Sequence, residues 1–173
     1  MANEAAIDAK PGPWMAAGGL ARWLLGAFSL VGGLTWALFT VHGPTAAVDL
    51  TVGVVLAAAG LVLLMPHRIR LPRRLTALAM SGFAVAGTAA GLVALTVRTV
   101  RTGSAYVYVE DRGWPFAWAQ RGGIADDPAT GQRLARAASW AVDAVSLATD
   151  ALLWAYAGML VVVITVLVRR RRP

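Results

Sequence analysis

The chain has 173 residues, of which 58% are hydrophobic and only 14% are charged. A soluble domain usually has about 25% charged residues, so the composition excludes an ordinary soluble globule and predicts a membrane protein. The formal net charge is +7, and of the 16 basic residues only Lys10 is a lysine. There is no cysteine, which excludes disulfide bonds and thiol redox chemistry.

Four apolar segments organise the sequence. Each has about the 20 residues needed to cross a bilayer as a helix, with few or no interior charges. They are predicted at residues 23–41, 46–65, 75–97 and 147–168. The expected divisions are a disordered cytoplasmic tail at 1–21, three spanning helices within 22–97, an outer segment at 98–146, a fourth helix at 147–168 and a basic tail at 169–173. The sequence thus predicts an all-α membrane protein, a four-helix bundle with a small outer segment.

Two arginine clusters set the direction of the spans. One follows the second span and the other follows the fourth; they comprise Arg68, Arg70, Arg73, Arg74, Arg169, Arg170, Arg171 and Arg172. Basic residues beside spans stay on the cytoplasmic side, so both termini are expected in the cytoplasm. The clusters favour anionic lipid head groups over nucleic acid as a partner, because they flank spans rather than lie on a soluble face. The Arg-rich, Lys-poor composition is typical of high-GC bacteria, so a multi-pass protein of the bacterial inner membrane is expected.

Small residues recur one helical turn apart within the spans. Gly87 and Gly91 form a GxxxG pattern in the third span, and Gly53 and Ala57 lie four apart in the second. Such spacing lets helix backbones approach closely. We expect close packing within the chain, with a homodimer seam as the alternative.

The outer segment shows strand and helix patterns. Alternating residues favour a short hairpin of 105–110 against 116–120, marginal by itself. Asp127 followed by Pro128 is typical of a helix start. From there an amphipathic helix is expected to continue into the fourth span, with Arg136, Asp143 and Asp150 on one face.

Five aromatic residues stand close together in this segment: Tyr106, Tyr108, Trp114, Phe116 and Trp118. One interpretation is an interfacial belt, since Trp and Tyr favour the head-group level of a membrane. The other is a partner-binding patch, since aromatic residues dominate binding hot spots.

Charged residues near the outer ends of the spans form a second candidate group: Asp49, Arg98, Arg101, Asp143 and Asp150. Intramembrane acids often mark ion paths, but Asp150 falls near the outer head groups rather than the midplane. A structural ion pair with Arg98 or Arg101 is therefore favoured. His42 and His67 fall at opposite membrane faces and cannot share a metal or a haem.

No pattern of catalytic, metal-binding or nucleotide-binding residues is present, so no enzyme activity, metal or cofactor is expected. The favoured function is that of an accessory or scaffold subunit, docking to a membrane partner through the outer aromatic segment. Homo-oligomerisation is an alternative mode of association. The alternative functions are a component of an oligomeric small transporter or channel, and a sensor of the envelope or of lipid state.

Overall fold

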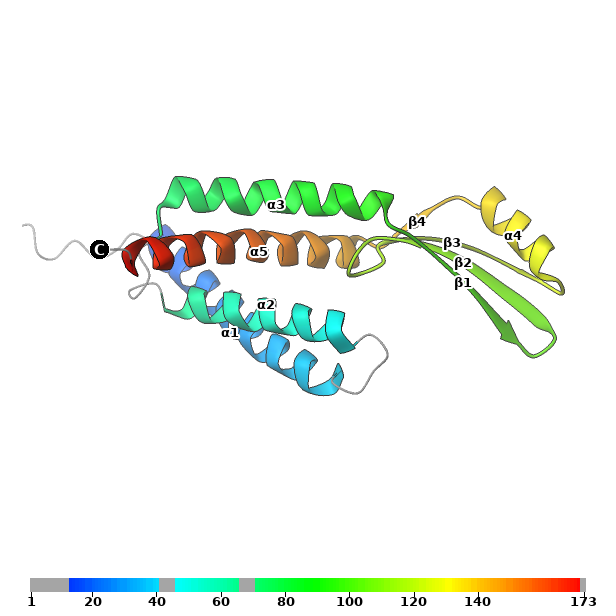
Figure 1. Ribbon diagram of the computed structural model, residues 1–173, viewed down its shortest axis with the longest axis horizontal. Coiled ribbons are helices and arrows are strands. Elements are labelled where there is room, and N and C mark those ends of the chain that lie inside the picture. The colour runs from blue at the N-terminus through cyan, green and yellow to red at the C-terminus, as the bar shows by residue number, and fades with distance from the viewer. Residues whose placement is uncertain (1–12, 41–45, 66–70, 172–173) are drawn as a thin grey trace, which may run out of the picture. The chain divides into compact units, whose positions relative to one another are not determined.

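A computed structural model of the chain describes residues 13–40, 46–65 and 71–171. These residues fall into two compact units, divided between Arg70 and Leu71, and each unit is described by itself. The helices and strands are α1 (Pro13–Thr40), α2 (Ala46–Leu64), α3 (Arg73–Val93), β1 (Leu95–Thr102), β2 (Ala105–Arg112), β3 (Ala119–Ala125), α4 (Pro128–Ala137), β4 (Ala141–Val142) and α5 (Ala144–Arg171) (Figure 1).

Four of these helices are long and apolar enough to cross a membrane. The stretches that meet this criterion are Ala17–Thr40, Ala47–Leu64, Arg73–Val93 and Ala144–Arg170. They confirm the four predicted spans and a multi-pass membrane protein. The predicted tail is too long, because α1 already begins at Pro13, a residue type favoured in the first turn of a helix. The remainder of that tail, residues 1–12, lies outside the described residues.

Helices α1 and α2 pack closely through glycines spaced seven residues apart. A Cβ added at Gly33 would lie 2.5 Å from the Ala57 nitrogen, and one at Gly60 would lie 2.5 Å from the Leu30 nitrogen. These neighbours are backbone atoms, which cannot move aside cheaply. Within this unit the small residues serve packing within the chain, as expected.

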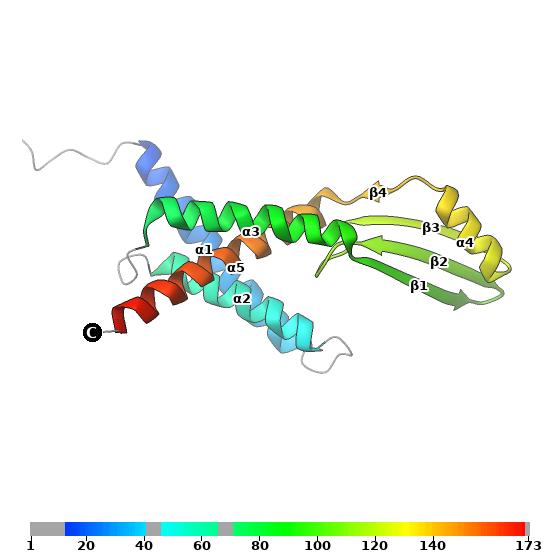
Figure 2. The same cartoon turned by 45° about the horizontal axis from the view of Figure 1, so that its top comes forward.

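Helices α3 and α5 form the second pair, which lies side by side in both ribbon views (Figures 1 and 2). A Cβ on Gly158 of α5 would lie 2.6 Å from the Ala79 carbonyl oxygen of α3. Gly87 of α3 makes room for the Trp154 ring, whose atoms would lie 2.2 Å from an added Cβ. Of the two glycines in the predicted GxxxG pattern, Gly87 thus packs against α5. The packing of the two pairs into one four-helix bundle stays a prediction.

The expectation of an all-α fold is wrong outside the membrane helices. Helix α3 ends at Val93, and residues 95–97, predicted as the end of the third span, belong to strand β1 at Leu95–Thr102. The predicted hairpin is part of a four-stranded antiparallel sheet in the order β1-β2-β3-β4. The second strand of the predicted hairpin is β3, Ala119–Ala125, rather than 116–120. Thr and Val dominate β1, and all of its eight residues pair with β2, so sheet formation outweighs a longer helix.

The predicted helix from residue 128 into the fourth span is interrupted. Helix α4 ends at Ala137, and the chain is extended at Ala138 with φ −73° and ψ 146° before it passes through β4. The Asp143 amide donates to the Trp118 carbonyl oxygen at 2.8 Å, which attaches this connection to the sheet. Arg136 and Asp143 therefore do not share one helical face with Asp150, because tertiary hydrogen bonds outweigh the local helical pattern.

Candidate functional site: a sheet with an open edge

One face of the sheet is covered by α4, which packs on β2 and β3. A Cβ on Gly123 would lie 2.4 Å from the Gly131 carbonyl oxygen, so the glycines allow strand and helix to touch. Tyr108 is 7% exposed at this contact, and the Gln132 side-chain amide donates to its hydroxyl at 3.3 Å. The predicted start of α4 is confirmed, because the Thr130 amide donates to the Asp127 carboxylate at 2.9 Å.

Two ion pairs fix the sheet, one on each face. On the α4 side the Arg121 Nε donates to Glu110 Oε2 at 2.6 Å, and on the opposite side the Arg98 Nε donates to Asp111 Oδ2 at 3.0 Å. Both acids are almost fully buried, at 4% and 3% exposed. A buried carboxylate needs such a partner, so these groups hold the fold together rather than wait for a substrate.

Trp140 joins the connection before α5 to the sheet. Its ring is in contact with two guanidinium groups, with the Arg112 Cζ 5.0 Å and the Arg121 Cζ 4.6 Å from the ring centroid. Arg112 also donates to the Leu92 carbonyl oxygen at 2.7 Å, near the end of α3. These contacts attach the sheet to α3, the helix that leads into it.

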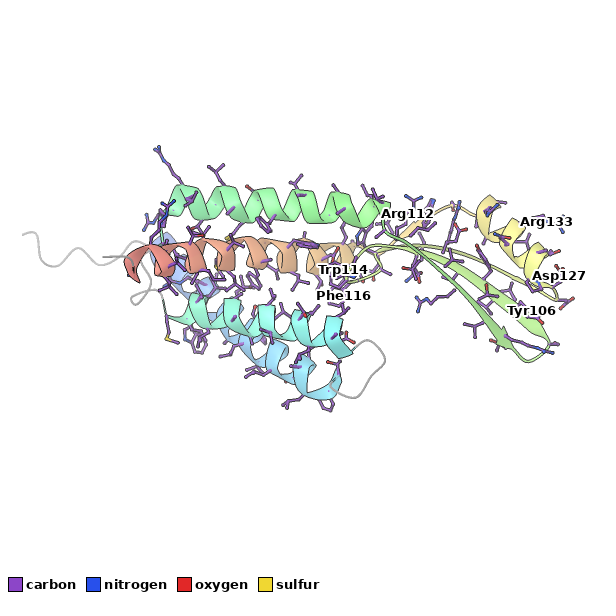
Figure 3. The ribbon with its side chains drawn as sticks, viewed as in Figure 1. Tyr106, Arg112, Trp114, Phe116, Asp127 and Arg133 are labelled. Carbon is purple, nitrogen blue, oxygen red and sulfur yellow. The ribbon has the colours of Figure 1, made fainter. Side chains whose placement is uncertain are left out.

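The loop 113–118 rests on the ends of α3 and α5 that lie beside the sheet (Figure 3). The Gly113 amide donates to the Gly91 carbonyl oxygen at 3.0 Å, and the positive φ of +122° at Gly113 suits only glycine. The Trp114 and Trp154 ring centroids are 5.6 Å apart, and the Trp154 indole donates to the Trp114 carbonyl oxygen at 3.3 Å. The loop therefore packs over the end of the α3–α5 pair.

Asp150 lies beneath this loop with no exposed surface. The groups that act on its carboxylate are the backbone amides of Phe116 and Trp114 and the indole of Trp118. None of them makes a hydrogen bond of ordinary geometry with it among the described residues. The predicted ion pair with Arg98 or Arg101 is wrong, because Arg98 pairs with Asp111. The Asp150 carboxyl is thus enclosed between α5 and the loop, near N–H groups but not hydrogen-bonded to them.

The other members of the predicted polar cluster do not gather around Asp150. Asp143 caps α5, where the Ser146 hydroxyl donates to it at 2.7 Å and lowers the pKa of its carboxyl below the usual value. Arg101 lies at the end of β1, with its guanidinium carbon 5.7 Å from the Tyr106 ring centroid. Asp49 stands in the first turn of α2, in the other unit.

The predicted aromatic patch is mostly enclosed. Tyr108 and Trp118 are buried, Tyr106 and Phe116 are half-buried, and Trp114 is 47% exposed. Their contacts are with α4, with the loop and with the ends of the membrane helices. Trp114 thus offers the most surface to a lipid head group or a partner, and both interpretations of the patch stay predictions.

The face of the sheet away from α4 carries exposed apolar side chains. Val100, Val107 and Ile124 are paired across three neighbouring strands and form an apolar row there. Val100 is 55% and Ile124 is 65% exposed. This row was not predicted, because residues 95–97 were assigned to the third span and residues 98–102 were not recognised as a strand; the Thr and Val content of residues 95–102 was the signal for a strand.

The described members of the two arginine clusters lie at the end of the α3–α5 pair opposite to the sheet (Figure 1). Arg73 and Arg74 begin α3 and are exposed, as are Arg169 and Arg170 in the last turns of α5. The helix continues through Arg171. The remaining anchors Arg68, Arg70 and Arg172, and both histidines, lie outside the described residues. Within this unit the sheet and the arginines thus mark opposite ends of the spans.

The described residues hold no group of three acidic or histidine side chains that could bind a metal ion. An apolar groove of about 260 Å³ lies between α3 and α5, lined by Phe83, Ala86, Gly87, Ala90 and Trp154. Comparison with known proteins found no matching family model, no similar curated protein and no similar solved structure.

Proposed function

We propose that the chain is a non-enzymatic subunit of the bacterial cell membrane, an accessory or scaffold protein that docks to a membrane partner through its outer sheet. In this proposal both termini are cytoplasmic and the sheet lies outside. The observation that carries it is the apolar row of Val100, Val107 and Ile124, in which Val100 and Ile124 are exposed, on a sheet that two ion pairs cross.

The row supports docking because a partner can cover apolar side chains on a water-exposed sheet face without a large cost in free energy. Isolated exposed apolar residues are common, but a row across three strands is a contiguous patch of the kind that marks interaction sites. The acids nearest to it offer no catalytic alternative, since the Asp111 carboxylate is buried and paired with Arg98. We therefore propose the open sheet face, rather than the aromatic residues, as the docking surface.

Photocrosslinking in native membranes tests the proposal. A photoreactive benzoylphenylalanine placed at position 124 should capture a membrane protein that the same group at position 133 does not. Arg133 is the matched control, because it is exposed on α4 and so lies on the other side of the sheet. Capture of nothing at position 124, or equal capture at both positions, would contradict docking through the open face.

The transporter alternative has its own test. It requires that Asp150 contact a passing ion, yet the side chain is covered by the loop 113–118. We expect reconstituted vesicles to show no ion flux above protein-free vesicles, and Asp49→Ala and Asp150→Ala to change nothing. A flux that Asp150→Ala abolishes would favour the transporter instead.

A further inference from the structure

Strand β1 is an open edge of the outer sheet. All of its eight residues are exposed, and it pairs with β2 over its whole length without a bulge. The opposite edge, β4, has only two residues. Every second residue of an edge strand turns its backbone N–H and C=O groups away from the sheet, and in the part of the chain that the structure describes these groups of β1 have no partner.

The usual protection of an edge is weak here. Natural edges are guarded by prolines, bulges or charges that point outward. The sequence LTVRTVRT contains no proline, and its charge at Arg98 is neutralised by the buried Asp111 on the neighbouring strand. Arg101 alone leaves its positive charge exposed, with the Nε donating to the Gly103 carbonyl oxygen at 3.4 Å. The edge is thus suited to accept another strand, and its remaining charge is positive.

A second copy of the chain does not fit this edge. Only Ala94 separates β1 from α3, and the strand runs away from the helix end (Figure 2). Antiparallel pairing of two β1 strands would place their α3 helices at opposite ends of the ladder, whereas copies in one membrane share one direction. Parallel pairing in register would bring Arg101 beside Arg101, and like charges oppose strand pairing.

We propose that β1 binds an extended, acidic segment of a different protein, which adds a fifth strand to the sheet. The partner's backbone satisfies the outward N–H and C=O groups of β1, and its carboxylates face Arg101. This mode of recognition gives affinity through main-chain hydrogen bonds and specificity through side chains on either face. The inference rests on the proposed docking function and names the structural form of the partner.

Crosslinking along β1 separates edge pairing from docking on the open face. Val97 and Val100 point to opposite faces of the sheet, and they are 49% and 55% exposed. A strand beside β1 passes both positions, so benzoylphenylalanine at 97 and at 100 should capture the same partner. Capture at 100 and 124 but not at 97 would overturn edge pairing and leave the docking function standing. Capture at none of the three would overturn both, and capture of further copies of the chain alone would overturn the different partner.

Substitution of Arg101 tests the charge of the partner with the whole chain in native membranes. Arg101→Glu should reduce crosslinking from position 100 at least tenfold, whereas Arg101→Lys should keep it within about twofold. Both variants leave the backbone of β1 unchanged, and the thermal unfolding of each in detergent verifies that the sheet is intact. Unchanged crosslinking in a folded Arg101→Glu variant would overturn an acidic partner.

Discussion

At the scale of single residues, the buried carboxylates of the sheet decide its stability. Glu110 accepts from Arg121 and from the Tyr108 hydroxyl, so its removal leaves a largely buried guanidinium without its acid. We expect Glu110→Ala to lower the free energy of unfolding by about 3 kcal/mol, as for other broken buried pairs. Thermal unfolding followed by tryptophan fluorescence in detergent measures this, because Trp140 lies on Arg121.

The matched control for Glu110 is Asp126, an exposed acid of the same domain. Asp126→Ala should change the stability by no more than about 0.5 kcal/mol. Equal effects of the two substitutions would contradict a special role for the buried pair.

The cap of α4 makes a pH-dependent contribution to stability. The Thr130 side chain and then its amide hydrogen-bond to Asp127 and hold the pKa of this carboxyl below its usual value of 3.8. Since the folded pKa is lowered, the stabilisation is complete above that usual value and is lost as the pH falls through the folded pKa. The unfolding temperature of the wild type should therefore fall between pH 5 and pH 2 more than that of Asp127→Asn, which caps without titrating.

The neighbouring substitution Asp126→Asn serves as the control, because Asp126 has no capping position. It should leave the pH dependence of the unfolding temperature as in the wild type. A wild type and an Asp127→Asn variant with the same acid profile would show that the cap does not titrate in this range.

At the scale of elements, glycine contacts hold the α1–α2 pair together. An added Cβ at Gly33 would meet backbone atoms at 2.5 Å, whereas one at Gly32 would meet nothing within 4 Å. Gly33→Ala should destabilise the pair by about 1–3 kcal/mol, while Gly32→Ala should be neutral or slightly stabilising because alanine favours helix. Thermal unfolding in detergent compares the two, and a larger loss for Gly32→Ala would contradict the observed packing.

At the scale of the whole molecule, the proposed direction of insertion is testable because the chain has no cysteine. Ile124→Cys should react with an impermeant thiol reagent added to intact cells, and Arg74→Cys should react only after the membrane is permeabilised. Both native residues are exposed. The reverse pattern would place the sheet in the cytoplasm and overturn the proposed topology.

Local patterns predicted the features that depend on local physics. Four apolar segments gave four spanning helices, because length and hydropathy alone decide whether a helix can cross a bilayer. The capping pair Asp127-Pro128 predicted the start of α4, because a side-chain cap acts within a single helical turn. The hairpin was found but made too small, since its edges depend on partners that lie elsewhere in the sequence.

What only the tertiary structure decided is which residues meet. The sequence determined by itself a membrane protein with four spans, no thiol chemistry and basic residues beside the spans. It could not determine that residues 95–97 leave the third span and join β1, because the gain from pairing with β2 is invisible in either segment alone. Nor could the sequence show that Arg98 forms its ion pair with Asp111 rather than with Asp150, because the register of β1 against β2 determines this partner. The open edge of β1 depends on both the end of α3 and the pairing of β1 with β2. It can therefore be recognised only in the folded sheet.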